Sequence, residues 1–162
     1  MTEAPARRDP MQVADAEARA QARGLLQRAT FAALSYTDAE TKTPAISRIA
    51  FGLDPEGRPL TFISALAQHH AGLRAFADCA LMVADDVGKG DPLTHPRLML
   101  RARAEFVAQA DPVLRAHWLK GHPKAALYID FADFCFVRFL PISAVLNAGF
   151  ARAYRLGAAD LA

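Results

Sequence analysis

The sequence contains very little cysteine. Its 162 residues include two cysteines, Cys79 and Cys135, which lie too far apart to form a CxxC pair. This scarcity excludes a disulfide-rich scaffold and a cysteine-based metal cluster, and both thiols occur in apolar stretches where a small buried side chain is expected. A reducing compartment is therefore the simpler expectation.

The sequence also lacks a long uninterrupted hydrophobic run. The first ten residues, MTEAPARRDP, have no apolar core of the kind that a secretory signal requires. The most apolar region, FADFCFVRFLPISAVLNAGF, is interrupted by Asp133, Arg138, Pro141 and Asn147, so it does not read as a membrane span. We expect a soluble cytoplasmic protein without a membrane partner.

Neither sign of charge is in large excess. The formal net charge of +2 gives little support to nucleic-acid binding, which depends on dense positive charge against phosphates. Hydrophobic residues make up 52% and charged residues 22%, as in ordinary globular proteins. The polar residues 1–10 predict a disordered tail. The length of the chain predicts a single domain, at residues 11–162.

Helical and strand patterns alternate irregularly along the chain. Good helix formers fill MQVADAEARAQARGLLQRA and predict a helix from residue 11 that includes Leu25 and Leu26. Short β-type runs follow at residues 29–38, 44–54 and 59–66, with turn-rich DAETKT and DPEGR between them. A helix is expected in HHAGLRAFAD, and CALMVADD is a further strand candidate.

The second half of the chain has the clearest alternation. In RLMLRARAEFVAQ the even positions from Leu98 to Phe106 are apolar, whereas Arg97, Arg101 and Arg103 occupy the other face. Asp111 is a suitable N-cap for a helix that starts at Pro112 and ends at Gly121. FCFVRFL and ISAVLNAGF are interpreted as two segments split by Pro141, because a central strand does not tolerate proline in mid-ladder.

These elements predict a mainly β fold. About six short strands with two or three helices, and no strict βαβ alternation, favour a small antiparallel barrel with peripheral helices. Walker, GxGxxG, HExxH and GxSxG motifs are absent from the sequence. No residue stands out as a general acid or base, so catalytic residues are left unassigned.

The histidines do not have the spacing of a metal site. His69 and His70 are adjacent and would lie about 100° apart on a helix, so they cannot converge on one ion. An anion site fits better, because a strand that ends at Ser64 and leads into a helix presents unpaired N–H groups, to which Arg48 can add a guanidinium. From the residue pattern alone, a solvated helix end is the preferred interpretation over a ligand site.

Five segments occur in an order that resembles a known superfamily. They are ISRIAF, TFISALAQHHAGL, GDPLTHPRLMLRARAEF, HPKAALYIDFADF and AGFARA. Together they are similar to the FMN-binding split-barrel superfamily of pyridoxamine 5'-phosphate oxidase, and most closely to its haem-utilisation (HugZ-like) branch. The resemblance extends from about Leu25 to Tyr154. It implies a six-stranded antiparallel split β-barrel, a homodimer, and one FMN per subunit in a groove between subunits.

The resemblance also implies which residues bind the flavin. Arg48 matches the strand arginine near the phosphate, and Ile49 and Ala50 match the backbone beside the ring system. The remaining implied residues are the strand-end pair Ile63 and Ser64, the phosphate-side pair His69 and His70, and Arg97 on a later strand.

The chain departs from the family pattern in three places. Gly72 replaces an expected asparagine, and Ala148 and Ala151 replace glycines of the terminal motif. The last residues, AADLA, contain neither the arginine that grips pyridoxal phosphate nor a late histidine that could ligate haem.

We therefore expect an FMN-binding flavoprotein, a flavin-dependent oxidoreductase of unknown substrate. The alternative is a haem-binding or haem-degrading protein, in which one of the five histidines would ligate iron. A dimeric scaffold without a cofactor is a third possibility.

Overall fold

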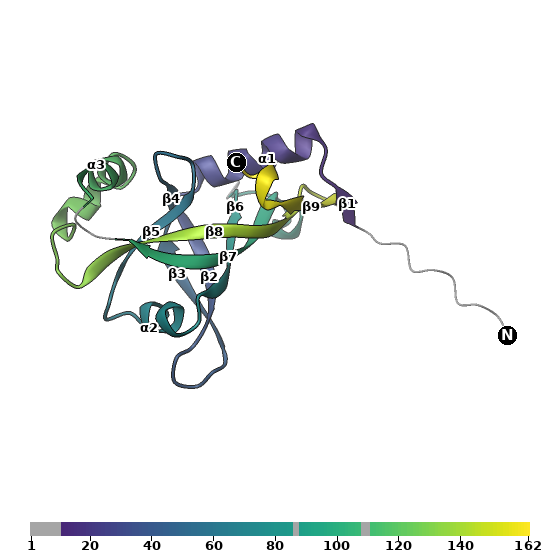
Figure 1. The fold of residues 1–162 in the computed structure, drawn as a ribbon. Helices are drawn as coiled ribbons and strands as arrows, with labels where there is room; N and C mark the ends of the chain where they lie inside the picture. Colours follow the sequence, from purple (N-terminus) through teal and green to yellow (C-terminus); the bar gives the residue numbers. More distant parts are fainter. Residues whose placement is uncertain (1–10, 86–87, 108–110) are drawn as a thin grey trace.

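The computed structural model describes residues 11–85, 88–107 and 111–162, and the predicted tail at residues 1–10 lies outside these ranges. The described chain is built mainly of β-strands, with three α-helices around them (Figure 1). The predicted mainly β fold with peripheral helices is confirmed. None of the helices in the described ranges is long and apolar enough to cross a bilayer.

Six longer strands form the body of the sheet. In sheet order they are β3 (Pro44–Ala50), β2 (Phe31–Thr37), β6 (Asp78–Ala84), β7 (Arg97–Val107), β8 (Phe134–Asn147) and β5 (Pro59–Ser64). All neighbours in this order pair antiparallel. Three short strands extend the sheet: β1 (Met11–Val13), β4 (Gly52–Leu53) and β9 (Ala153–Gly157). The β1–β9 pair is parallel, so the complete sheet is mixed.

The sheet curls without closing into a continuous barrel. β3 lies beside β5, yet no ladder joins these two strands within the described residues. The buried Thr61 of β5 instead donates its hydroxyl to the carbonyl of Ala50 at 2.6 Å. A side-chain hydrogen bond thus links β5 to β3 where no backbone ladder joins them.

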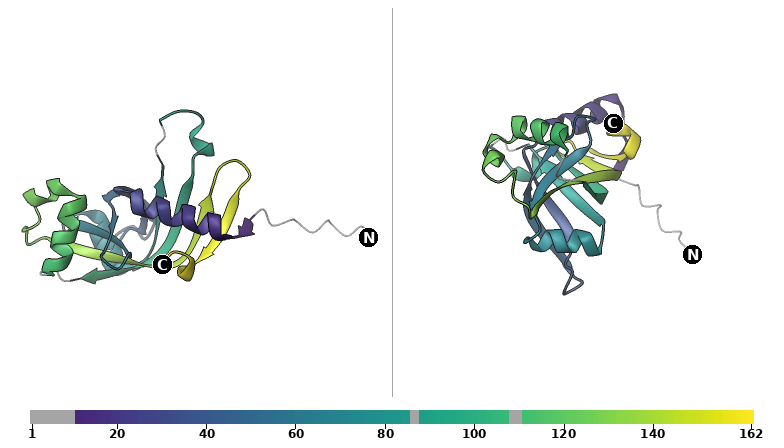
Figure 2. Two further views of the ribbon diagram at one scale, coloured as in Figure 1. Left: turned by 90° about the horizontal axis from the view of Figure 1, so that it is seen from above. Right: turned by 60° about the vertical axis from the view of Figure 1, so that its left-hand side comes forward.

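The core has two parts. The larger lies between the sheet and α1 (Ala16–Arg28), and it includes Leu25 of the helix and Leu100 of β7. The smaller forms where α3 (Pro112–Gly121) packs Trp118 against Phe136 of β8. Figure 2 shows α1 laid along the sheet and α3 near one end of it.

The helix signals of α3 are confirmed residue by residue. Asp111 accepts hydrogen bonds from the amides of Val113 and Leu114 at 3.0 Å each, and the helix starts at Pro112 and ends at Gly121. The predicted helix after residue 68 is α2 (Gln68–Ala75). The alternation in β7 is also confirmed, because Leu98, Leu100 and Ala102 are buried while Arg101 and Arg103 are exposed.

The predicted helix from residue 11 is wrong over its first turn. Met11–Val13 forms β1, which pairs with Ala153–Arg155 of β9, and α1 begins at Ala16 after the N-cap Asp15. Local propensity favours a helix here, but pairing with a strand from the far end of the chain prevails.

The predicted break at Pro141 is also wrong, because β8 runs continuously through this residue. β5 pairs with residues 134–138 and β9 with residues 143–147, so the missing N–H of Pro141 falls where neither strand pairs. On the other side, the register with β7 shifts between Arg101 and Ala102. Such a bulge is the exception under which a strand accepts proline.

The structure explains one of the departures from the family pattern and shows backbone strain at another. A Cβ on Gly72 would lie 2.5 Å from Cδ2 of Tyr36 and 2.6 Å from the carbonyl of Thr37, so α2 approaches β2 too closely for an asparagine. Ala151 has a φ of 58°, in the left-handed region that glycine adopts with less strain.

Replacing Gly72 by alanine is expected to lower the free energy of unfolding by about 1 to 3 kcal/mol, because the carbonyl of Thr37 cannot rotate away as a side chain can. Gly121→Ala is the control, since a Cβ there meets no atom within 4 Å. Urea unfolding of the two variants measures the difference. Equal midpoints would show that the contact between α2 and β2 is loose.

Candidate functional site

Of the three predicted residues on β3, Arg48 is the most exposed. Its guanidinium lies over the ring of Phe31, 5.1 Å from the centroid. Ile49 is 4% exposed and belongs to the core, and the carbonyl of Ala50 accepts the hydroxyl of Thr61. Ile49 can therefore contact a ligand only through its backbone, whereas the carbonyl of Ala50 is already engaged by Thr61.

Arg48 and Arg97 lie at one hollow of about 480 Å³ on the outer face of the sheet, here called the Arg48–Arg97 hollow. Its floor is formed by Phe31, Ala33, Met82 and Ala84. Strand register places these residues on one face, because Ala33 is opposite both Arg48 and Met82, and Ala84 is opposite Arg97. The pairing of β3, β2, β6 and β7 thus brings together two arginines that are 49 positions apart in sequence.

The rim of the hollow is built by the segment before β7. Arg97 donates from Nη1 to the carbonyls of Leu93 at 2.9 Å and His95 at 3.4 Å. Nε2 of His95 lies 2.8 Å from the carbonyl of Lys89. Because a carbonyl only accepts, Nε2 carries the proton, and the lone pair of the neutral ring is on Nδ1. Arg97 therefore both lines the hollow and orders its rim.

Ser64, His69 and His70 form a separate group that does not line this hollow. Ser64 ends β5, and its hydroxyl donates to Oδ2 of Asp133 at 2.5 Å and accepts from the amide of Leu66 at 3.1 Å. The preceding Ile63 is 4% exposed and packs in the core. A phosphate at Ser64 would have to replace the carboxylate of Asp133.

The two histidines pack against aromatic side chains. His69 meets the ring of Tyr36 edge-on at 6.1 Å, and His70 meets Phe106 edge-on at 5.1 Å. Burial lowers the pKa of both rings, with a further contribution from His70 to His69 and from Arg74 to His70. Both are thus mainly neutral near pH 7 and offer neutral N–H donors beside the start of α2, which no side chain caps.

No protein-family model matches the chain. The non-canonical heme oxygenase HOZ, a chloroplastic protein of Arabidopsis thaliana, is 34% identical over 112 residues, which cover 68% of this chain and 34% of that protein. The chain therefore spans about a third of the length of the curated relative that it matches.

Solved structures match over more of the chain. One solved structure is 41% identical with a TM-score of 0.87, and the match covers 93% of this chain and 98% of the chain in that structure. A heme binding protein from Mycobacterium smegmatis is 22% identical with a TM-score of 0.81, covering 92% and 61%. A Clostridium acetobutylicum protein of the pyridoxinephosphate oxidase family, related to general stress protein 26, is 14% identical with a TM-score of 0.66, covering 92% and 100%. The chain has the fold of the pyridoxamine 5'-phosphate oxidase-like split-barrel proteins. Its resemblance to the haem-utilisation branch is confirmed by these relatives.

The two cysteine thiols of this split-barrel protein are not activated. The described residues contain no group of three or more histidine, cysteine or acidic side chains placed to hold a metal ion. Burial, aided by the nearby Asp78, raises the pKa of Cys79 to about 12, and burial also raises the pKa of Cys135. Neither thiol is therefore suited to act as a nucleophile.

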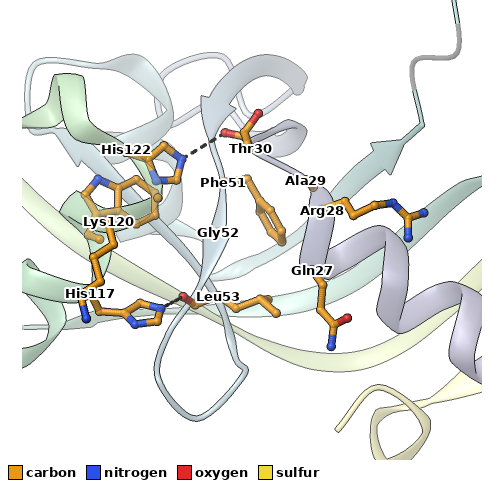
Figure 3. A pocket seen from close by; sticks show the side chains of 12 residues that line it. Gln27, Arg28, Ala29, Thr30, Phe51, Gly52, Leu53, His117, Lys120 and His122 are labelled. Atoms are coloured by element: carbon orange, nitrogen blue, oxygen red, sulfur yellow. Dashed lines mark hydrogen bonds between the residues drawn. The ribbon is translucent and has the colours of Figure 1, made fainter.

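Sequence reasoning missed two features of this split-barrel protein, of which the first is the apolar lining and histidine of the Arg48–Arg97 hollow. His95 precedes a proline, a context that by itself favours only a structural role, yet it lines the Arg48–Arg97 hollow. The exposed Phe31 and Met82 were expected only as strand residues, although their alternation with the buried Ala32 and Leu81 could have indicated an apolar outer face. The second feature is a pocket between α1 and α3 (Figure 3), which holds His117 and His122.

Proposed function

We propose that this protein binds FMN at the Arg48–Arg97 hollow and acts as a flavin-dependent oxidoreductase. The observation that carries the proposal is the pairing of two guanidinium groups with an apolar floor. A flat ring system with an anionic end requires this combination of surfaces.

The residues of the hollow suit such a ligand. Each guanidinium can present two parallel N–H donors to a phosphate. The one carboxylate among the described lining residues, Asp85, already pairs with Arg28 at 3.0 Å, which reduces its repulsion of an anion. Phe31 and Met82 offer the ring apolar contact. Bound FMN would supply the redox chemistry, while the chain fixes the phosphate, orients the ring and excludes water.

We also propose that two copies of the chain form a homodimer through this outer face. Phe31, Met82 and Leu93 are 51%, 46% and 75% exposed, and they lie in or beside the hollow. A second copy that covers them would bury apolar surface and enclose the flavin. The group formed by Ser64, His69 and His70 could then complete the site from either subunit.

Haem is the second candidate ligand. Similarity to proteins named as a heme oxygenase and a heme binding protein favours it, as does His95 at the hollow, whose Nδ1 lone pair is of the kind that ligates iron. Arginines also suit the propionates of haem, so their presence does not separate the two candidates. A preference for FMN over riboflavin, which lacks the phosphate, does separate them.

FMN is expected to bind more tightly than riboflavin, which has the same ring but no phosphate. A charge-assisted hydrogen bond contributes about 1.5 to 3 kcal/mol. Arg48→Ala should therefore reduce the ratio of the FMN affinity to the riboflavin affinity by roughly tenfold or more. Quenching of flavin fluorescence measures both affinities. Arg103→Ala is the control, because Arg103 is exposed on β7, pairs with Asp78 and does not line the hollow. Equal affinities of the wild type for FMN and riboflavin would reject the phosphate site.

A further inference from the structure

The turn between β8 and β9 presents an aromatic side chain to solvent. Phe150, in this turn, is 88% exposed, the highest fraction among the large apolar residues of the described ranges. Turns usually carry glycine, proline, asparagine, aspartate or serine, which suit the backbone angles of a turn. A single exposed apolar side chain needs no explanation by itself, so the backbone that holds Phe150 and the surface beside it decide its meaning.

The backbone has a positive φ on both sides of Phe150. The φ of Gly149 is 123° and that of Ala151 is 58°, and Ala151 is one of two non-glycine residues with a positive φ in the described ranges. The amide of Ala148 donates to the carbonyl of Arg152 at 2.8 Å, which closes the turn. A left-handed alanine costs free energy, and such strain is found most often at functional positions.

This turn adjoins the rim of the Arg48–Arg97 hollow. Asn147, the last residue of β8, is opposite Arg97 in the register with β7. A Cβ on Gly149 would lie 3.7 Å from the carbonyl oxygen of Thr94, which belongs to the rim segment before β7. The two segments project side by side from the sheet (Figure 2). Phe150 is thus anchored beside the hollow of its own subunit.

The hollow offers a flat ligand one apolar wall. The floor of Phe31, Ala33, Met82 and Ala84 contacts a ring from one side. Among the described lining residues outside the floor, Pro92 is the one apolar side chain. A flavin ring on this floor therefore exposes its second face to water unless another apolar side chain covers it.

We propose that Phe150 packs over the outward face of the flavin ring and forms the second wall of the flavin site. This inference rests on the FMN site proposed above. Contact between two aromatic ring systems in an offset stack is favourable beyond the area that it buries. Phe150 touches the ring and not the phosphate, so it contributes to the affinity for any flavin and not to the preference for FMN over riboflavin.

Phe150→Ala is expected to weaken FMN and riboflavin by the same factor, about tenfold, because both ligands carry the ring. Isothermal titration calorimetry of the full-length protein measures both affinities. Phe150→Tyr, which keeps an aromatic ring, should retain the wild-type affinities. Leu127→Ala is the control, because Leu127 is 80% exposed and does not line the hollow.

Phe150→Trp supplies a readout that a merely structural role would not move. An indole in contact with a flavin ring quenches the emission of the flavin. The flavin-saturated Phe150→Trp protein should therefore emit less flavin fluorescence than the saturated wild type, whereas Leu127→Trp should leave this emission unchanged.

The outcomes separate this inference from the flavin site itself. If the wild type binds FMN and Phe150→Ala leaves both affinities unchanged, or weakens FMN alone, the role of Phe150 is wrong and the phosphate site stands. Unchanged affinities in a Phe150→Ala protein that has become monomeric in gel filtration would assign Phe150 to the dimer interface and would also overturn the inference. A wild type that binds neither flavin would reject the proposed function, and this inference with it.

Discussion

Replacing Asp54 by alanine is expected to lower the free energy of unfolding by about 3 to 5 kcal/mol. The side chain of Asp54 is 0% exposed, and Oδ2 accepts Nε of Arg58 at 2.7 Å and Nε of Arg138 at 2.9 Å. Oδ1 accepts the amides of Glu56 and Arg58 at 3.0 and 2.9 Å. Alanine would leave the guanidinium of Arg138, only 17% exposed, without its carboxylate.

The stability that Asp54 contributes should depend on pH in a defined direction. Burial alone would raise the pKa of Asp54, but hydrogen bonds from the Arg58 amide and from the Arg138 and Arg58 side chains lower it on balance below 3.8. A carboxyl whose folded-state pKa is depressed stabilises the protein above its unfolded-state pKa, and that stability is lost as the pH falls through the folded-state value. The difference in free energy of unfolding between wild type and Asp54→Asn should thus be largest at pH 6 to 7 and decrease below about pH 4.

Urea unfolding monitored by Trp118 fluorescence measures both effects. Asp78→Ala is the control, because Asp78 pairs with Arg103 on the surface, where the two side chains are 76% and 64% exposed, and should cost less than about 1 kcal/mol. A loss at Asp54 no larger than at Asp78 would show that the two arginines are adequately solvated without the carboxylate.

The double variant Arg48→Ala, Arg97→Ala is expected to weaken FMN binding at least about 100-fold. Each substitution removes charge-assisted hydrogen bonds to the phosphate. Replacement of Arg97 also removes its hydrogen bonds to the rim carbonyls of Leu93 and His95. Riboflavin should lose less affinity, because its contacts are with the apolar floor. Isothermal titration calorimetry of both ligands gives the two ratios.

The matched control is Arg101→Ala, Arg103→Ala. These arginines are exposed on the same strand, carry the same charge and lie outside the hollow. If the control weakens FMN as much as the double variant does, the effect is one of general surface charge. If neither variant weakens FMN binding, the phosphate does not bind at the Arg48–Arg97 hollow.

The parts of the fold that sequence predicted are those in which local rules act alone. Asp111, Pro112 and Gly121 delimit α3 because capping and glycine termination operate within a few residues. β1 was missed because it depends on pairing with β9 at the far end of the chain. The unbroken β8 was missed because Pro141 lies where neither β5 nor β9 requires its N–H.

The site was predicted only as separate residues. Resemblance indicated Arg48 and Arg97, but their shared hollow follows from strand register, which depends on pairings among four strands. The phosphate-side role of Ser64, His69 and His70 stays a prediction. Local sequence could not reveal that Ser64 bonds Asp133, 69 positions later in the chain.

The visible absorption spectrum of the purified protein, taken after gel filtration with and without prior addition of FMN, tests the central claim most directly. The account predicts flavin bands that remain with the protein peak, a shape altered from that of free FMN by contact with Phe31 and Met82, and no Soret band. A Soret band without flavin bands, or FMN that separates completely from the protein at micromolar concentration, would contradict it.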